Sequence, residues 1–279
     1  MDIITGTERI QKITNGLRRK NKSIGFIPTM GALHKGHLKL VRESKAKNDV
    51  TIVSIFVNPA QFSSTDDLAK YPRSFEKDKR LLEREKIDYL FYPEVKTMYP
   101  DGFQTNVITA KLADIFEGKS RPRHFTGVAT VVLKLFNLVQ PTNAYFGQKD
   151  FQQCVVIKQM IRDLNLPIDI NVVPTVRDTD GLALSSRNIF LNSQERLEAL
   201  NLYQTLLLGK KLIVEENKNA EFIKTKMKNY LRKYKLIRLD YIEICNPKNL
   251  FPVKIVSKRV IILIAAYVGK TRLIDNIII

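Results

Sequence analysis

Short apolar runs alternate with amphipathic stretches through the first part of the chain. The run at residues 50–57 is rich in β-branched side chains and stops at Asn58-Pro59, which predicts a strand. Its lack of strict polar alternation is typical of a strand covered on both faces of a parallel sheet. A helix after Gly36 would place four side chains on one face: Leu38, Leu40, Val41 and Ser44.

The same criteria predict that strands and helices alternate further along the chain and that this alternation ends near residue 185. Strands are predicted at 23–27 (ending at Pro28), 88–92, 144–146 and 168–173, and helices at 74–86 (with Ser74 as N-cap), 128–139 and 151–164. Strands that alternate with helices form βαβ units and a parallel sheet. Beyond residue 185 the pattern predicts helices at 193–216 and 220–235, then strands at 240–245, 260–268 and 272–278, with a hairpin turn at Gly269-Lys270.

These elements predict an α/β fold, with a Rossmann-like doubly wound parallel sheet followed by a smaller C-terminal α+β domain. We place the domain boundary near residue 180, which gives domains 1–180 and 181–279. A length of 279 residues, with 44% hydrophobic and 27% charged residues, suits a globular chain with a substantial core.

The cysteines and the apolar runs bear on the compartment. Cys154 and Cys245 are far apart and no C-x-x-C motif occurs, so we interpret both as thiols. The N-terminus lacks the basic head and long apolar stretch of a signal peptide. The longest apolar runs are strand-sized and well below the roughly 20 residues of a membrane helix. We therefore expect a soluble, cytoplasmic protein without a membrane partner.

The net charge of +18, from 46 Lys+Arg against 28 Asp+Glu, raises the possibility of nucleic-acid binding. The basic residues are spread along the chain, with only short clusters such as residues 18–20, and no nucleic-acid-binding motif is visible. We favour a lysine-rich surface on an enzyme with anionic substrates, which a positive surface attracts. No nucleic-acid partner is predicted.

The segment PTMGALHKGH, residues 28–37, leaves a predicted strand and enters a predicted helix. Ligands of open parallel sheets bind beyond the carboxyl ends of the strands. Gly31 and Gly36 allow the backbone to approach a ligand, and the helix N-terminus offers N–H groups and a positive dipole end. His34 and His37 lie three residues apart, so both can face one phosphate group. The segment therefore predicts a phosphate site.

A zinc site is the main alternative for the two histidines. A His-x-x-His pair at a helix start can ligate zinc, but no Cys, Glu or third His lies nearby at ligand spacing. The chain has only 3 histidines, so two of them in one glycine-containing turn favour a functional role. We prefer phosphate binding and predict no metal ligands among the side chains.

The His-x-Gly-His string is the signature of the nucleotidylyltransferase superfamily, and the surrounding residues resemble the pantothenate synthetase family more specifically. Similar strings follow in the family's order: SIFVNP at 54–59 with Gln61-Phe62, YPR at 71–73, YPDG at 99–102, RPRHF at 121–125, KLFNLVQP at 134–141, FGQKDFQQ at 146–153, DGLALSSRN at 180–188 and RLIDN at 272–276. The resemblance covers nearly the whole chain.

The resemblance implies an ATP-dependent condensation of pantoate with β-alanine to give pantothenate through a pantoyl-adenylate, with release of AMP and pyrophosphate. ATP is then a substrate, Mg²⁺ accompanies the nucleotide, and the enzyme is a homodimer. The first domain would bind ATP and pantoate, and the second would close as a lid. The alternative is another nucleotidylyltransferase of the same superfamily.

The resemblance also assigns site residues. It implies ATP binding by Met30, Gly31, Ala32, Leu33, His34, Lys35, Gly36, His37, Gly147, Gln148, Lys149, Asp150, Val176, Leu184, Ser185, Ser186 and Arg187. The catalytic residues among them would be His37 (as proton donor), His34, Lys149 and Arg187. Pantoate would be held by Gln61, Gln153, Met30 and Asn58, and β-alanine by Gln61.

Several of these residues also have ordinary structural interpretations. Gln61 and Gln153 would be unremarkable amides without the resemblance, and Ser185-Ser186-Arg187 could be a turn that caps a helix. The chain departs from the family at Gln148, where the family usually has Glu. If that carboxylate tunes Lys149, nucleotide affinity changes, but the reaction type does not.

Overall fold

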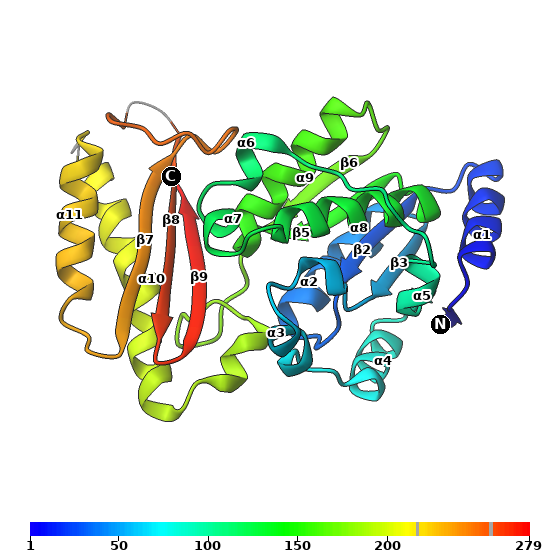
Figure 1. Cartoon of the computed structure of the whole chain (residues 1–279), viewed down its shortest axis with the longest axis horizontal. Helices are drawn as coiled ribbons and strands as arrows, with labels where there is room; N and C mark the ends of the chain where they lie inside the picture. The colour runs from blue at the N-terminus through cyan, green and yellow to red at the C-terminus, as the bar shows by residue number, and fades with distance from the viewer. Residues whose placement is uncertain (216–217, 257–258) are drawn as a thin grey trace. The chain divides into compact units, whose positions relative to one another are not determined.

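The computed structural model describes residues 1–215, 218–256 and 259–279. The chain forms two compact units, coloured by position along the chain in Figure 1. The first comprises Met1–Gly147 and Gln152–Pro174, and the second comprises Gln148–Phe151 and Thr175–Ile279. In this division the chain passes into the second unit after Pro174. The domain boundary near residue 180 stays a prediction.

The first unit is a parallel sheet in the strand order β1-β4-β3-β2-β5-β6, which confirms the Rossmann-like prediction. The strands are β1 (Asp2–Ile4), β2 (Ile24–Thr29), β3 (Val50–Ile55), β4 (Tyr89–Phe91), β5 (Asn143–Gly147) and β6 (Asp169–Val173). The helices are α1 (Thr7–Arg19), α2 (Lys35–Lys47), α3 (Thr65–Lys70), α4 (Phe75–Arg84), α5 (Val95–Met98), α6 (Ala110–Ala113), α7 (Glu117–Ser120), α8 (His124–Val139) and α9 (Phe151–Asp163), with a short 3-10 turn, η1 (Pro59–Gln61).

Alternate residues of the central strands enter two different cores. Phe26 and Ile52 pack in one cluster with side chains of α1, α8 and α9, whereas Ile27 and Val53 pack in another with side chains of α2 and α4. Figure 1 shows α8 crossing one face of the sheet. The sheet is therefore buried on both faces, which explains why its strands lack polar alternation.

The sheet loses pairing where its strand order reverses. The chain winds from β2 through β3 to β4 on one side and from β5 to β6 on the other. Among the described residues, β2 pairs with β5 only at Gly25 with Asn143 and Phe26 with Ala144, although both strands continue. Such a switch point, at the carboxyl ends of parallel strands, is where open α/β sheets bind ligands.

Pro28 corrects one predicted strand end and explains the lost pairing. We expect the strand to stop before this proline, yet β2 continues through it to Thr29. On the β3 side the pairing is complete, and Phe56 N–H donates to the Thr29 carbonyl at 2.9 Å. The backbone polar groups of successive strand residues point to opposite edges of the strand, so those of Pro28 point toward β5. Because proline has no N–H, it cannot extend the hydrogen-bond ladder there.

The second unit is an antiparallel sheet in the order β7-β8-β9 with two long helices. Its elements are η2 (Gln148–Asp150), η3 (Ser186–Phe190), α10 (Ser193–Val214), α11 (Ala220–Leu231), β7 (Ile237–Cys245), β8 (Ile261–Val268) and β9 (Thr271–Ile278). Leu206, Ile223 and Ile264 belong to one core that α10 and α11 share with the sheet. Gly269, with a φ of +56°, opens the two-residue turn from β8 to β9, as the sequence predicts.

Other element boundaries differ from the sequence predictions. Neither β1 nor α1 is predicted from the sequence, and α8 starts at His124, four residues before its predicted start. The helix predicted at 220–235 ends at Leu231, and the one predicted at 193–216 runs to Val214, with 216 outside the described residues. Ser74 occupies the N-cap position of α4, but its side chain makes no capping hydrogen bond.

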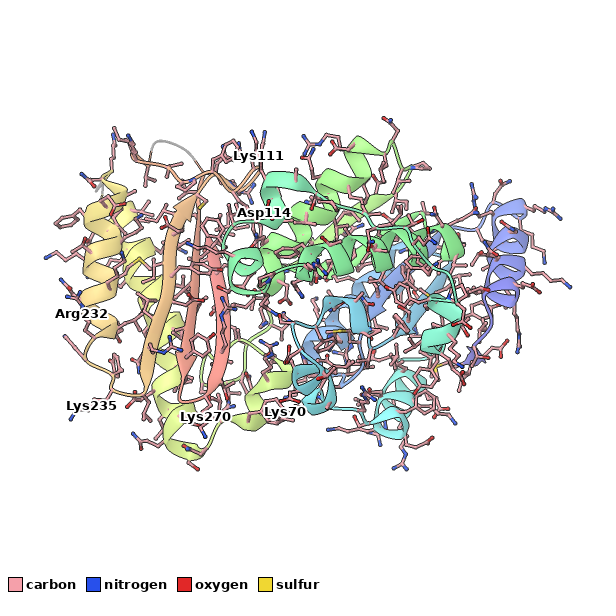
Figure 2. All side chains as sticks on the ribbon, in the orientation of Figure 1. Lys70, Lys111, Asp114, Arg232, Lys235 and Lys270 are labelled. Atoms are coloured by element: carbon pink, nitrogen blue, oxygen red, sulfur yellow. The ribbon has the colours of Figure 1, made fainter. Side chains whose placement is uncertain are left out.

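The thiols and the basic side chains agree with the composition. Cys154 and Cys245 are both buried and free. Figure 2 shows labelled basic residues pointing outward from separate elements of each unit, including Lys111 on α6 and Lys270 in the turn after β8. Among the described residues, none of the helices combines the length and apolar character needed to cross a lipid bilayer.

The contact of β2 with α2 predicts a stability difference between two glycine variants. A Cβ on Gly25 would collide with Ser44 Oγ and lie 2.6 Å from Asn48 Nδ2. We expect Gly25→Ala to lower the free energy of unfolding by about 1–3 kcal/mol through overpacking. Gly16→Ala in α1, where no atom lies within 4 Å of the new Cβ, is the control. It should raise stability by about 0.5–1 kcal/mol because alanine favours helix. Chemical denaturation compares the two, and equal stabilities would contradict the close packing.

Candidate active site

A buried carboxylate holds the turn between β2 and α2. Asp78, on α4, is 1% exposed. Its Oδ2 accepts the N–H of Ala32 and its Oδ1 accepts the N–H of Leu33, both at 2.8 Å. Gly31 and Ala32 have φ values of +82° and +50°. Because the left-handed conformation costs a non-glycine residue roughly 1–2 kcal/mol, the two hydrogen bonds stabilise a turn that the chain would otherwise avoid.

Asp78 is a site residue that the sequence analysis misses. Burial raises the pKa of its carboxyl group, and the two backbone N–H groups act in the opposite direction. The signal that could have identified it is its spacing, because Asp78 precedes the fully buried Leu82 by one helical turn. A carboxylate on the apolar face of an amphipathic helix needs donors, and the turn after β2 supplies them.

The two predicted histidines stand together at the start of α2. His34 is the N-cap residue, and its Nδ1 accepts the N–H of Gly36 at 3.1 Å. His37 Nδ1 accepts the N–H of His34 at 3.3 Å, and the ring centroids are 4.1 Å apart. A neutral imidazole that accepts at Nδ1 carries its proton at Nε2. Both rings are therefore Nε2–H donors.

This geometry corrects the predicted origin of the phosphate contacts. We expect unengaged N–H groups at the helix start, but those of His34 and Gly36 donate to imidazoles, and those of Ala32 and Leu33 donate to Asp78. The prediction is wrong for His34 and Gly36 at the helix start, because imidazoles already cap their N–H groups.

Three of the predicted pantoate residues lie in direct contact. Gln61 Nε2 donates to Met30 Sδ at 3.0 Å, and Asn58 Nδ2 donates to Gln61 Oε1 at 3.0 Å. Asn58 and Gln61 follow β3 and are 1% and 7% exposed. Gln153 lies in the first turn of α9, which follows β5 and thus begins at the same edge of the sheet.

Helix α8 supports the Gln61 segment through two residues that the sequence analysis assigns no role. His124 Nδ1 lies 2.8 Å from the Gln61 carbonyl oxygen and donates to it. A Cβ on Gly127 would lie 2.7 Å from the Gln61 backbone nitrogen, so only glycine permits this approach of η1 to α8. Single-sequence patterns carry no sign of such a close approach between distant segments.

Gly147 ends β5 in the first unit, whereas the predicted residues Gln148–Asp150, Val176 and Leu184–Arg187 lie in the second. Gln148 has a defined partner there. Gln148 Nε2 donates to Asn276 Oδ1 at 3.1 Å, and Asn276 Nδ2 donates to the carbonyls of Gln148 and Lys149 at 2.9 and 3.0 Å. A glutamate at 148 could not donate to Asn276. The hydrogen bond to Asn276 is therefore a structural reason for glutamine at position 148, apart from any effect on Lys149. The Nζ of Lys149 lies 3.5 Å from Asp150 Oδ1.

Val176 and Leu184 are neighbours, since the N–H of Leu184 donates to the Val176 carbonyl at 3.0 Å. Arg177 between them forms two hydrogen bonds to Asp275, at 2.6 and 2.9 Å, and stacks on Tyr203.

A small cavity in this unit is lined by Lys149, Ala183, Ser185 and Asp275. The Ser185 side chain accepts the N–H of Arg187 at 3.3 Å, so it does cap η3, which also contains Ser186.

Side chains that could ligate a metal ion are not clustered in the part of the chain that the structure describes. In the ranges 1–215, 218–256 and 259–279, no group of three or more His, Cys, Asp or Glu could hold a metal ion.

Known proteins are similar to this chain over its full length. The family model described as Pantoate-beta-alanine ligase matches residues 2–278. Pantothenate synthetase of Caldicellulosiruptor saccharolyticus is 52% identical over 279 residues, covering 100% of this chain and 99% of the relative. Pantothenate synthetase of Thermosipho africanus is also 52% identical over 279 residues, covering 100% of both.

Two crystal structures are similar to this chain. Pantothenate synthetase from Thermus thermophilus has a TM-score of 0.93 and 41% identity, covering 99% of each chain. Pantoate-beta-alanine ligase from Francisella tularensis, complexed with beta-gamma ATP and beta-alanine, has a TM-score of 0.80 and 39% identity, covering 99% of this chain and 97% of the other.

The Asp78 hydrogen bonds predict a measurable loss of stability. Asp78→Asn retains one acceptor oxygen and leaves the N–H of Ala32 or Leu33 without one, which costs about 1–3 kcal/mol. We expect the free energy of unfolding to fall by that amount in a denaturant titration. The control is Glu76→Gln, which removes an exposed charge from the same helix. Its free energy of unfolding should stay within about 0.5 kcal/mol of the wild-type value. Equal values for both variants would show that Asp78 does not hold the turn.

Proposed function

Because the chain belongs to the pantoate–β-alanine ligase family and is an ATP-dependent ligase that forms pantothenate, we propose that it acts through a pantoyl-adenylate made at the β2–α2 turn. ATP would lie with its phosphates at His34 and His37, and pantoate would lie at Gln61. β-Alanine would then react from the side of Gln61.

In the first step, a carboxylate oxygen of pantoate attacks the α-phosphorus of ATP. The bond from that phosphorus to the bridging oxygen breaks, and pyrophosphate leaves. The Nε2–H groups of His34 and His37 stabilise the negative charge that builds on the phosphate oxygens, and His37 donates toward the leaving group. Mg²⁺ bound to the phosphates would neutralise part of the same charge.

In the second step, the neutral amine of β-alanine attacks the acyl carbon of the adenylate. A C–N bond forms, the acyl C–O bond breaks, AMP leaves, and the nitrogen releases a proton. The protein mainly holds the reactants in position for both attacks. Met30, Asn58, Gln61 and Gln153 would position pantoate, and Gln61 would also meet β-alanine.

The observation that supports this assignment best is the 3.0 Å contact of Gln61 with Met30. Met30 begins the turn that leads to both histidines at the start of α2, whereas Gln61 follows the neighbouring strand. The contact therefore links the proposed acid site to the proposed phosphate site, as transfer between a carboxylate and the α-phosphate requires.

Other assignments complete the proposal. ATP contacts would also come from Gly31, Ala32, Leu33, Lys35, Gly36, Gly147, Gln148, Lys149, Asp150, Val176, Leu184, Ser185, Ser186 and Arg187, with Lys149 and Arg187 as cations toward the phosphates. A family match over residues 2–278 favours this reaction over that of another nucleotidylyltransferase. The homodimer and the cytoplasmic location implied by the resemblance stay predictions.

Product analysis tests the reaction directly. We expect AMP and pantothenate in equal amounts when ATP, pantoate, β-alanine and Mg²⁺ are supplied together. Omission of β-alanine should leave ATP–pyrophosphate exchange that depends on pantoate, because the adenylate forms without the amine. Exchange that proceeds equally well without pantoate would rule out the pantoyl-adenylate.

His37→Ala tests the charge-stabilising role of the imidazole. The variant loses an Nε2–H donor and should slow pantoate-dependent exchange by about 10²–10³-fold, the usual effect of removing one such donor. Lys39→Ala, an exposed residue further along α2, is the control and should exchange at the wild-type rate. Circular dichroism checks that both variants fold. A wild-type rate in the folded His37→Ala variant would remove His37 from the mechanism.

A further inference from the structure

Asn58 uses its full hydrogen-bonding capacity inside the protein. Its Oδ1 accepts the N–H of Ala60 at 3.2 Å and the hydroxyl of Tyr99 at 2.8 Å. Its Nδ2 donates to Gln61 Oε1 and to the Gly127 carbonyl, both at 3.0 Å. A primary amide offers two donor hydrogens and two acceptor lone pairs, so all four positions are filled. Asn58 therefore reaches a substrate only through its neighbours.

Backbone groups determine which way the Asn58 amide points. The Gly127 carbonyl can only accept a hydrogen bond, and the Ala60 N–H can only donate one. If the amide were reversed, its oxygen would face the Gly127 carbonyl oxygen and its NH₂ group would face the Ala60 N–H. Tyr99 adds a second donor on the oxygen side. Burial raises the pKa of Tyr99 to about 12, so its hydroxyl keeps its proton at neutral pH.

This orientation passes to Gln61. Because Asn58 presents its NH₂ group, Gln61 must present Oε1 to Asn58, which turns Nε2 toward Met30 Sδ. A thioether sulfur is a weak acceptor. A substrate oxygen would therefore replace it with a gain in hydrogen-bond strength.

We propose that Asn58 and Tyr99 are positioning residues that make Gln61 a hydrogen-bond donor, so that its Nε2 meets an acceptor oxygen of the pantoate carboxylate. This inference rests on the proposed function, because it takes pantoate as the ligand of Gln61. An N–H donor needs an acceptor oxygen, and it bonds more strongly to the charged carboxylate, which only accepts, than to the neutral oxygen of a hydroxyl.

Tyr99→Phe is the first test, because it removes one hydroxyl and keeps the ring. We expect the KM for pantoate to rise about 3- to 10-fold, the value of one hydrogen bond, with the KM for ATP unchanged. The matched control is Tyr145→Phe, which also removes a phenol hydroxyl bonded to an asparagine, in this case Asn48 at 2.8 Å. It should lower stability similarly and leave both KM values unchanged.

Asn58→Asp is the second test, because it retains the acceptor side and replaces the donor group by an acceptor. Gln61 would then turn its NH₂ group inward and present Oε1 to the substrate. We expect the KM for pantoate to rise by about 10- to 100-fold, because the hydrogen bond from Gln61 to the charged carboxylate is replaced by repulsion between two oxygens. ATP affinity, measured by calorimetry, should stay within about twofold. If this variant does not fold, the Tyr99 and Tyr145 pair decides the question.

The outcomes separate this inference from the proposed function. Wild-type protein that makes no AMP from ATP and pantoate with β-alanine would reject the function itself. An active wild type whose Tyr99→Phe variant keeps its pantoate KM, or raises the KM values for ATP and pantoate equally, would overturn the positioning role alone. A selective rise in the pantoate KM in Tyr99→Phe, absent from Tyr145→Phe, supports it.

Discussion

The lost pairing between β2 and β5 is the constraint on which the rest of the site depends. After Phe26 the two strands no longer share a ladder, and Pro28 removes the N–H that could continue one. The backbone that leaves β2 is thus directed into the β2–α2 turn, while β3 still holds its other edge. Segments from both halves of the sheet can then converge on one edge without competing for sheet hydrogen bonds.

Buried polar groups then define the shape of that edge. Asp78 holds a left-handed turn through two N–H groups, and Asn58, itself fixed by its other hydrogen bonds, orients the Gln61 amide. A buried polar group left without a partner is costly, so each network permits few alternative arrangements. The same groups that stabilise the fold therefore also determine which functional groups face the substrates.

The sequence predicted features that repeat along the chain and missed those that join distant segments. Apolar periodicity identified the face of α2 that carries Leu38 and Val41, because helical spacing is local. The edge strand β1 was missed because three residues carry no measurable period. Tyr99 stands in the family-like string YPDG but received no role, and Gly127 gave no signal, since the roles of both depend on contacts with Asn58, which is distant in sequence.

The histidine pair shows where motif reasoning succeeded and where it failed. The spacing of His34 and His37 correctly predicted two imidazoles at one turn, but the expected backbone donors at the helix start were wrong. A site built from backbone N–H groups tolerates side-chain changes, because the donors remain. Here the imidazoles engage those N–H groups at Nδ1 and offer Nε2–H in their place. Removing one ring takes away an Nε2–H donor and also leaves the N–H group that this ring capped without its acceptor.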